Sequence, residues 1–184
     1  MPEATLSPPT VRPPADDDAL YEIVRGRRVE LPPTGAIETV LATMLTRLIG
    51  PYLDANPLGR LAGETLFLID PVADIQRRPD LAFVSYQRWP REQRLPPTNA
   101  WGVVPDLVVE VVSPSSAAVE VLDKLQEYFR AGVRLVWVVY PVQEQFYVYD
   151  SPISVRVLQR ADVLDGGAVL PDLRLPLAKL FEVG

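Results

Sequence analysis

Apolar side chains are concentrated in two short runs that flank a helical pattern. Residues 107–112 are apolar except for Glu110, and a second apolar run ends at Pro141. Between the runs, apolar residues recur at helical spacing. This pattern predicts a strand, a helix that begins near Ser115 or Ser116, and a second strand. The predicted buried stripe of the helix is Val121, Leu122, Leu125, Tyr128 and Phe129, and its solvent face is Glu120, Asp123, Glu127 and Arg130.

Glu110 is the one charged residue in the first apolar run. An apolar strand joined to a crossover helix is usually buried on both faces of its sheet. An ionised glutamate there is unfavourable by several kcal/mol unless a cation, a metal ion or hydrogen bonds compensate its charge. Glu110 is therefore the first candidate for a functional residue.

The N-terminal part predicts a leader, a hairpin and a long helix. Residues 1–18 hold five prolines and an acidic run, which is typical of a disordered leader, and residues 19–184 are expected to form a single domain. Two alternating runs within Leu20–Leu31 predict a β-hairpin. Thr34 or Gly35 can cap a helix that follows, and Gly50-Pro51 ends or kinks it. Its predicted apolar stripe is Ile37, Val40, Leu41, Met44, Leu45 and Leu48.

Glu38 lies at the border of that stripe, in the first turn of the predicted helix. An acid at this place is favoured by the positive end of the helix dipole without any further role. The alternative is that its carboxylate reaches into a site on the sheet. The sequence leaves both interpretations open, as it does for Glu64, which is predicted to share a strand face with Leu66 and Leu68.

The remaining runs predict a sheet with antiparallel edges, and the fold class is mixed α/β. A loop containing Asp74 and Arg77-Arg78 precedes Pro79-Asp80, where a short strand starts. Residues 86–100 are rich in arginine and proline and predict a surface loop. The apolar tail at residues 169–181 is expected to dock on the core. The predicted strands of this part are residues 60–70, 81–85, 145–150 and 153–158, the last two antiparallel.

The composition excludes several kinds of catalytic and metal-binding site. The 184 residues contain no cysteine and no histidine, which excludes disulfides, thiol nucleophiles, histidine bases and histidine or thiolate metal ligands. Any metal must therefore be a hard cation that prefers oxygen ligands. The net charge of −6 argues against a surface coated by nucleic acid, without excluding a local basic patch. No apolar run has membrane-spanning length and no signal-peptide pattern occurs, so we expect a cytoplasmic protein without a membrane partner.

Lys124 and Asp80 are placed where they could join Glu110. Glu110 lies roughly 10 Å before the end of its strand, and Lys124 lies about 12 Å along the predicted helix. A helix that folds back over the sheet therefore brings these side chains to similar heights. The alternative for Lys124 is an ion pair with Glu120, four residues earlier. The alternative for Asp80 is local hydrogen bonding in a turn, which is the interpretation that we favour for Asp106.

Several blocks of the chain resemble a known family. The three main blocks are RRPDLAFVS (Arg77–Ser85), VPDLVVEVVSPSS (Val104–Ser116) and KLQEYFRAGVRLVWVVYP (Lys124–Pro141). They are similar to the signature blocks of the Uma-two family, bacterial proteins classed with restriction-endonuclease-like folds. The Tyr21-Glu22…Gly26 hairpin and the C-terminal tail also match, so the resemblance extends from about Leu20 to Phe181.

The resemblance implies a PD-(D/E)XK nuclease core, a mixed sheet flanked by helices in which carboxylates hold Mg²⁺ or Mn²⁺ near a lysine. At the matching positions, Asp80 is implied as a metal ligand and Glu110 as the second acid. The backbone carbonyl of Val111 is implied as a further ligand. Val112 stands where the superfamily has its lysine, so Lys124 on the helix is implied as the replacement.

The first hypothesis is therefore a Mg²⁺-dependent endonuclease that acts on DNA. Asp80 and Glu110 would bind the metal, Lys124 would orient the attacking water, and Glu38 is a fourth candidate for the site. By analogy, such an enzyme forms a homodimer that cuts both strands. The candidate nucleic-acid rim is Arg77, Arg78, Arg88, Arg91 and Arg94, with a solvated loop as the alternative.

Two other hypotheses stand beside it. A non-catalytic module of the same fold would bind nucleic acid or a protein partner through a relict site, which the acidic pI of about 4.7 favours. Many Uma-two members have a histidine at the start of the first helix, where this chain has Gly35-Ala36-Ile37-Glu38, and this departure favours the same hypothesis. In the third hypothesis, Glu110 and Lys124 only neutralise each other inside the core.

Overall fold

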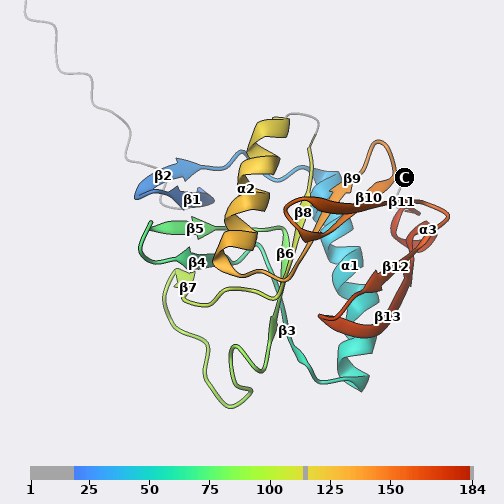
Figure 1. The fold of residues 1–184 in the computed structure, drawn as a ribbon, viewed down its shortest axis with the longest axis horizontal. Coiled ribbons are helices and arrows are strands. Elements are labelled where there is room, and N and C mark those ends of the chain that lie inside the picture. The colour runs from blue at the N-terminus through green and yellow to red at the C-terminus, as the bar shows by residue number, and fades with distance from the viewer. Residues whose placement is uncertain (1–18, 114–115, 183–184) are drawn as a thin grey trace, which may run out of the picture.

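The computed structural model describes residues 19–113 and 116–182. The predicted leader and Ser115, one of the two predicted helix caps, lie outside these residues. The described chain forms a six-stranded sheet, a five-stranded sheet and a two-stranded sheet, with three helices packed around them (Figure 1).

The six-stranded sheet carries the centre of the fold. Its strand order is β11-β10-β9-β8-β6-β3. Within this sheet β8 and β9 pair in parallel, as expected for strands joined by a crossover helix, and the other neighbours are antiparallel. Its strands are β3 (Gly59–Gly63), β6 (Leu81–Ser85), β8 (Leu107–Val111), β9 (Leu135–Tyr140), β10 (Gln145–Ser151) and β11 (Ser154–Gln159).

The five-stranded sheet contains the predicted N-terminal hairpin. Its order is β2-β1-β5-β4-β7, and the hairpin pairs with the rest of the sheet through β1 and β5. Its strands are β1 (Tyr21–Val24), β2 (Arg27–Glu30), β4 (Leu66–Asp70), β5 (Ile75–Arg77) and β7 (Ala100–Trp101). The separate ribbon consists of β12 (Val163–Gly166) and β13 (Leu170–Pro176), and the helices are α1 (Ala36–Ala55), α2 (Ala118–Ala131) and α3 (Leu177–Leu180).

Alternate residues of the central strands pack against different helices. Val109 of β8 belongs to the core that contains Leu41 of α1, whereas Val108 belongs to the core that contains Leu125 of α2. Successive strand residues point to opposite faces, so α1 and α2 cover the two faces of the sheet (Figure 1). The predicted mixed α/β class, the hairpin and the C-terminal antiparallel strands are confirmed.

The start of α2 differs from the prediction. The helix begins at Ala118 with Ala117 as its N-cap, and no side chain caps it. The hydroxyl of Ser116 instead accepts a hydrogen bond from the Ser113 N–H at 3.2 Å. Serine therefore stabilises the turn that leaves β8, because its hydroxyl competes well for nearby backbone groups.

The predicted strand at residues 60–70 is divided into two. The break falls at Glu64, whose φ of +44° lies in the left-handed region, and β3 and β4 belong to different sheets. The predicted loop that follows contains the short strand β5. The break depends on the backbone conformation of one residue, which the hydrophobic pattern does not encode.

The first helix continues past Pro51 to Ala55. Proline removes one donor from the ladder, but Tyr52 still packs on the core, and its hydroxyl donates to the Pro171 carbonyl at 2.6 Å. Tertiary contacts thus hold the last turn in place.

Both helices are rotated relative to their predicted stripes. Ile37 and Val40 are 43% exposed, whereas Glu38 is 6% exposed. Leu122 of α2 is 51% exposed, although the pattern predicts it in the buried stripe. Glu127, which the pattern predicts on the solvent face, is half-buried. At these positions of the two helices, charged side chains are more buried than apolar residues of the predicted stripes.

None of the described helices is long and apolar enough to cross a membrane.

Substitution of Gly59 by alanine is expected to lower the free energy of unfolding by about 2–3 kcal/mol. A Cβ at Gly59 would lie 2.6 Å from Cζ of Phe83 and closer still to the Val84 carbonyl, so the sheet would have to shift. The control is Gly50→Ala in α1, where a Cβ meets no side chain within 4 Å beyond those of its chain neighbours. That change should alter the stability by less than about 1 kcal/mol, because the helix propensity of alanine is offset by contact of its Cβ with the ring of Pro51. Urea denaturation measures both, and equal stabilities of the two variants would contradict this packing.

Candidate active site

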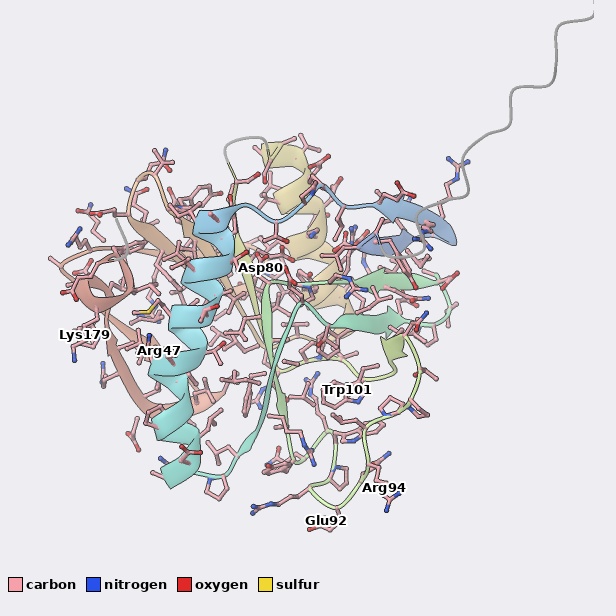
Figure 2. The ribbon with its side chains drawn as sticks, turned by 180° about the vertical axis from the view of Figure 1, so that it is seen from behind. Arg47, Asp80, Glu92, Arg94, Trp101 and Lys179 are labelled. Atoms are coloured by element: carbon pink, nitrogen blue, oxygen red, sulfur yellow. The ribbon has the colours of Figure 1, made fainter. Side chains whose placement is uncertain are left out.

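A cavity of about 590 Å³ lies between the β1–β2 hairpin, the start of α1, the start of α2 and the ends of β6 and β8. All the candidates for catalysis and metal binding singled out from the sequence line it, namely Glu38, Asp80, Glu110, Val111 and Lys124. Figure 2 shows Asp80 between α1 and α2. Segments that are far apart in the sequence thus supply one concave site.

Strand register places Asp80 and Glu110 together. Leu81 of β6 pairs with Val109 of β8, and the antiparallel direction then brings Asp80 opposite Glu110. Both lie two residues from a side chain in the α2-facing core, Ala82 in β6 and Val108 in β8. Because side chains alternate along a strand, both carboxylates face α2.

Lys124 of α2 meets two carboxylates. Its Nζ lies 3.0 Å from Oε1 of Glu22 and 3.3 Å from Oε2 of Glu110. The lysine therefore reaches the sheet from the helix, at the height that the sequence indicated. The structure shows no ion pair between Lys124 and Glu120 within the described residues. Glu110 also accepts a hydrogen bond at 2.5 Å from the hydroxyl of Tyr128, which is 1% exposed.

Glu22 is a central residue of the site that sequence reasoning did not select. Only 2% exposed, it accepts hydrogen bonds from Arg77 Nη1 at 2.6 Å and from the Arg78 N–H at 3.0 Å. Arg77 continues the network to Glu127, with its Nε 2.7 Å from Oε2. Glu22 lies between Leu20 and Val24 on one strand face, so it is a charge at an apolar position. The same signal drew attention to Glu110.

Within this network the pKa values of Glu22 and Glu110 are shifted in opposite directions. Burial acts to raise the pKa of Glu22, but Lys124 and Arg77 outweigh it and the net pKa is lowered. Burial raises the pKa of Glu110, and Lys124 offsets only part of that rise. Burial acts to lower the pKa of Lys124, but Glu110 and Glu22 reverse this and the net pKa is raised. Lys124 is accordingly a permanent ammonium, held more closely by Glu22 than by Glu110.

Asp80 is a buried acid that makes no ion pair within the described residues. Burial and the nearby charge of Glu110 raise its pKa to about 7, against the opposing effects of a backbone hydrogen bond and of Lys124. That hydrogen bond comes from the Val111 N–H, 2.6 Å from Oδ2. In a β-strand the N–H and C=O of one residue point to the same side. The Val111 carbonyl is therefore directed toward the side of β8 on which Asp80 lies.

Glu38 and Glu64 both line the cavity but differ in their partners. Glu38 is buried, and its Oε2 has no hydrogen-bond partner within the described residues. Glu64 is exposed and accepts a hydrogen bond from the Thr34 hydroxyl at 2.8 Å. Glu38 thus keeps an unused acceptor inside the protein, which is unfavourable unless something from solution binds it.

Of the five predicted rim arginines, only Arg77 and Arg78 line the cavity. Arg77 is buried in its ion pairs, and Arg78 donates to the backbone carbonyls of Tyr21 and Glu64. Arg88 donates to the Val104, Pro105 and Gly132 carbonyls and pairs with Asp106, which is a structural role.

Arg91 and Arg94 are exposed, and they lie on the 86–100 loop. Figure 2 shows Arg94 far from Asp80.

Asp106 is 1% exposed, accepts from the Ser85 N–H at 2.8 Å and pairs with Arg88 and Arg134. Its role is thus structural, but its partners are distant in the sequence and not within the turn that the sequence favoured.

The donor set of the cavity fits a hard divalent cation. Eight acidic side chains and three basic ones line it, so negative charge exceeds positive charge. Within the described residues, no three acidic side chains lie close enough to form a metal site by themselves. Mg²⁺ typically takes only one or two carboxylates, with water and phosphate oxygens completing its shell. The raised pKa of Asp80 and the unpartnered oxygen of Glu38 show that these two carboxyl groups have little positive charge bound to them, as ligands of a cation would.

Comparisons with known proteins agree with the fold. A family model named Uma2 and described as "Putative restriction endonuclease" matches residues 10–178. Among solved structures, the chain is similar to one described as a putative nuclease belonging to DUF820 from Anabaena variabilis ATCC 29413. The TM-score is 0.75 at 18% identity, over 88% of this chain and 89% of that chain, which shows a shared fold. No curated protein matches the sequence significantly.

Asp80→Asn is expected to stabilise the metal-free protein at pH 8 and to have little effect near pH 4. The folded state keeps the proton of Asp80 until about pH 7, whereas an unfolded aspartate loses it near 3.8. Wild-type stability therefore falls as the pH rises between these values, and the neutral amide, which still accepts from Val111, removes that loss of about 1–3 kcal/mol.

Urea denaturation in a chelator at both pH values measures this difference. The control is Asp54→Asn, at an exposed position of α1 outside the cavity. A gain at pH 8 no larger than at pH 4 would contradict the raised pKa.

Lys124→Met is expected to lower the free energy of unfolding by about 3 kcal/mol, because Glu22 and Glu110 would lose their shared ammonium inside the protein. The matched control is Lys179→Met, which replaces the other lysine of the chain at an exposed position of α3. Thermal unfolding at pH 7.5 compares the two. A Lys124 variant as stable as the Lys179 variant would show that the ion pairs do not hold the site together.

Proposed function

Because the Uma2 match spans most of the chain, the protein belongs to the Uma2 family of putative restriction endonucleases, and we propose that it is a divalent-metal-dependent nuclease that hydrolyses DNA. One observation carries this proposal. Asp80, Glu110 and Lys124 come from a strand end, a strand and a helix, and they converge in one cavity. Two carboxylates and an ammonium are a minimal set for phosphodiester hydrolysis assisted by a metal.

The proposed ligands are Asp80 and Glu110, with the Val111 carbonyl beside them. Mg²⁺ or Mn²⁺, when bound, supplies Lewis-acid activation of water and balances charge on the phosphate. Tyr128 keeps Glu110 oriented through its hydrogen bond. Asp80 must lose its proton to act as a ligand, so metal binding should strengthen as the pH rises past about 7.

Lys124 is proposed to donate a hydrogen bond to the attacking water or to a phosphoryl oxygen. Glu22 keeps the Lys124 ammonium in place. The distances from Lys124 Nζ to the two carboxylate oxygens of Glu110 are longer, at 3.3 and 3.5 Å. Ammonium–carboxylate hydrogen bonds are usually about 2.7–2.9 Å. Glu110 is therefore loosely held by Lys124, and one of its oxygens can turn to another cation. Glu38 would hold water through its free oxygen.

The excess of carboxylates also determines the order of binding. A phosphate that enters a cavity with eight acids and three bases is repelled until a cation is present. DNA binding at this site should therefore require the metal.

A homodimer stays a prediction, to be checked by the particle mass in light scattering.

The alternative is a module of the same fold that binds nucleic acid or a protein partner without catalysis. The observation in its favour is that Glu22 and Glu110 already neutralise Lys124. In that case the cavity would bind no divalent cation at millimolar concentration. Metal binding therefore separates the two functions.

Calorimetric titration with Mn²⁺ at pH 8 is expected to show binding that Asp80→Asn removes, because the substitution takes away a charged ligand. The same variant should lose at least about 100-fold in the Mn²⁺-dependent cleavage of supercoiled plasmid and single-stranded circular DNA. Asp54→Asn is the matched control, with the same chemical change outside the cavity. Absence of Mn²⁺ binding by the wild type, or full activity of Asp80→Asn, would contradict the proposal.

A further inference from the structure

The register of the β1–β2 hairpin places an arginine beside the cavity, on the hairpin face that lines it, although Arg27 itself is not one of the lining residues. Glu22 pairs with Val29, and Val24 pairs with Arg27. Directly opposed residues of an antiparallel pair share a face. Glu22, Val24 and Val29 all line the cavity, so the Arg27 side chain lies on the same face, one pair further out toward the turn. The cavity face of the hairpin thus carries Glu22 beside Val29 and, at the next pair toward the turn on that face, Val24 beside Arg27.

Arg27 has no structural task of its own. It is exposed, and within the described residues it makes no hydrogen bond or ion pair. Its neighbour Arg28 lies on the other face of the hairpin and stacks on the Tyr21 ring, 4.1 Å from the centroid. The free guanidinium of Arg27 is suited to a phosphate, which it can bind in bidentate fashion.

The rest of the cavity mouth is acidic. Exposed acidic residues line it, among them Glu64, Glu120 and Asp123. Duplex DNA carries one negative charge per about 1.7 Å of axis on two backbones. A mouth with a basic group at the outer end of the hairpin and acids elsewhere can accept one backbone along the hairpin, but it repels a second one.

The depth of the reactive groups leads to the same conclusion. The side chains of Glu110 and Lys124 are 15% and 19% exposed. A cavity of about 590 Å³ is too small to enclose a segment of duplex DNA. A single nucleotide can enter it, and its base can pack on the apolar wall formed by Val24, Val29 and Val112.

We propose that the site takes an unpaired DNA strand that runs along the cavity face of the hairpin, with Arg27 binding the backbone phosphate next to the one at Asp80 and Glu110. This inference rests on the proposed nuclease function. It adds the strandedness of the substrate and a specificity residue outside the acid cluster.

Binding is measured by fluorescence anisotropy of a labelled 20-nucleotide strand and of the same strand in a duplex, with Ca²⁺ as the divalent cation. The single strand should bind at least about 10-fold more tightly than the duplex. Arg27→Gln should weaken single-strand binding about 5- to 10-fold and reduce the slope of log K against log salt by about 0.7, the value for one phosphate contact. Arg47→Gln, the same change at an exposed position of α1, is the control and should leave both unchanged.

Three results would overturn the inference: equal or tighter binding of the duplex, an Arg27→Gln variant that behaves like Arg47→Gln, or no binding of either DNA. Mg²⁺-dependent cleavage of the two substrates is scored separately. Cleavage of the duplex alone would contradict the inference and leave the nuclease function intact. Strand-selective, Arg27-dependent binding without any cleavage would support the inference and contradict catalysis.

Discussion

The Lys124 ammonium between Glu22 and Glu110 is the interaction on which the site depends. It joins the N-terminal hairpin, the central strand β8 and the helix α2. Without the ammonium, neither glutamate could stay ionised in its buried position at low cost, since an uncompensated buried charge is unfavourable by several kcal/mol. Arg77 and Tyr128 complete the arrangement by binding the remaining oxygens of the two glutamates. The hairpin is therefore docked by charge as much as by strand pairing.

The same network leaves part of the cavity short of positive charge. Glu22 receives two basic side chains and a backbone N–H, whereas Asp80 receives only the Val111 N–H and a distant effect of Lys124. Glu22 is consequently stabilised as an anion while Asp80 holds its proton to about pH 7. The divalent cation that we propose for the cavity would remove this imbalance, which connects the electrostatics of the cavity to the proposed chemistry.

Much of the fold could be predicted from local pattern. The β8–α2–β9 unit was recognisable because its apolar runs and its helical stripe are long, and Glu110 stood out inside it. The break at Glu64 was not recognisable, since one left-handed residue changes the sheet to which a strand belongs and the hydrophobic pattern does not encode its backbone conformation. The rotation of α1, which buries Glu38, was also missed, because the cavity that receives this acid is formed by other segments.

The candidate site was only partly visible in the sequence. The positions of Asp80, Glu110 and Lys124 could be inferred from strand rise, helix rise and the family resemblance. The role of Glu22 depends on the pairing of β1 with β5, which brings Arg77 beside it, and no local pattern encodes that pairing. The predicted arginine rim shows the same limitation in reverse. Arg88 looked available in the sequence, but its donors are directed at backbone carbonyls.

The most direct test of this account is a crystal structure of the protein grown or soaked in Mn²⁺ at pH 8, with anomalous diffraction used to locate the ion. We expect an anomalous peak between the Asp80 and Glu110 carboxylates, with Lys124 still bound to Glu22. Absence of a peak there, with Lys124 and Glu110 still paired and a protein of intact fold, would show that the cavity is a neutralised core and would contradict the metal site.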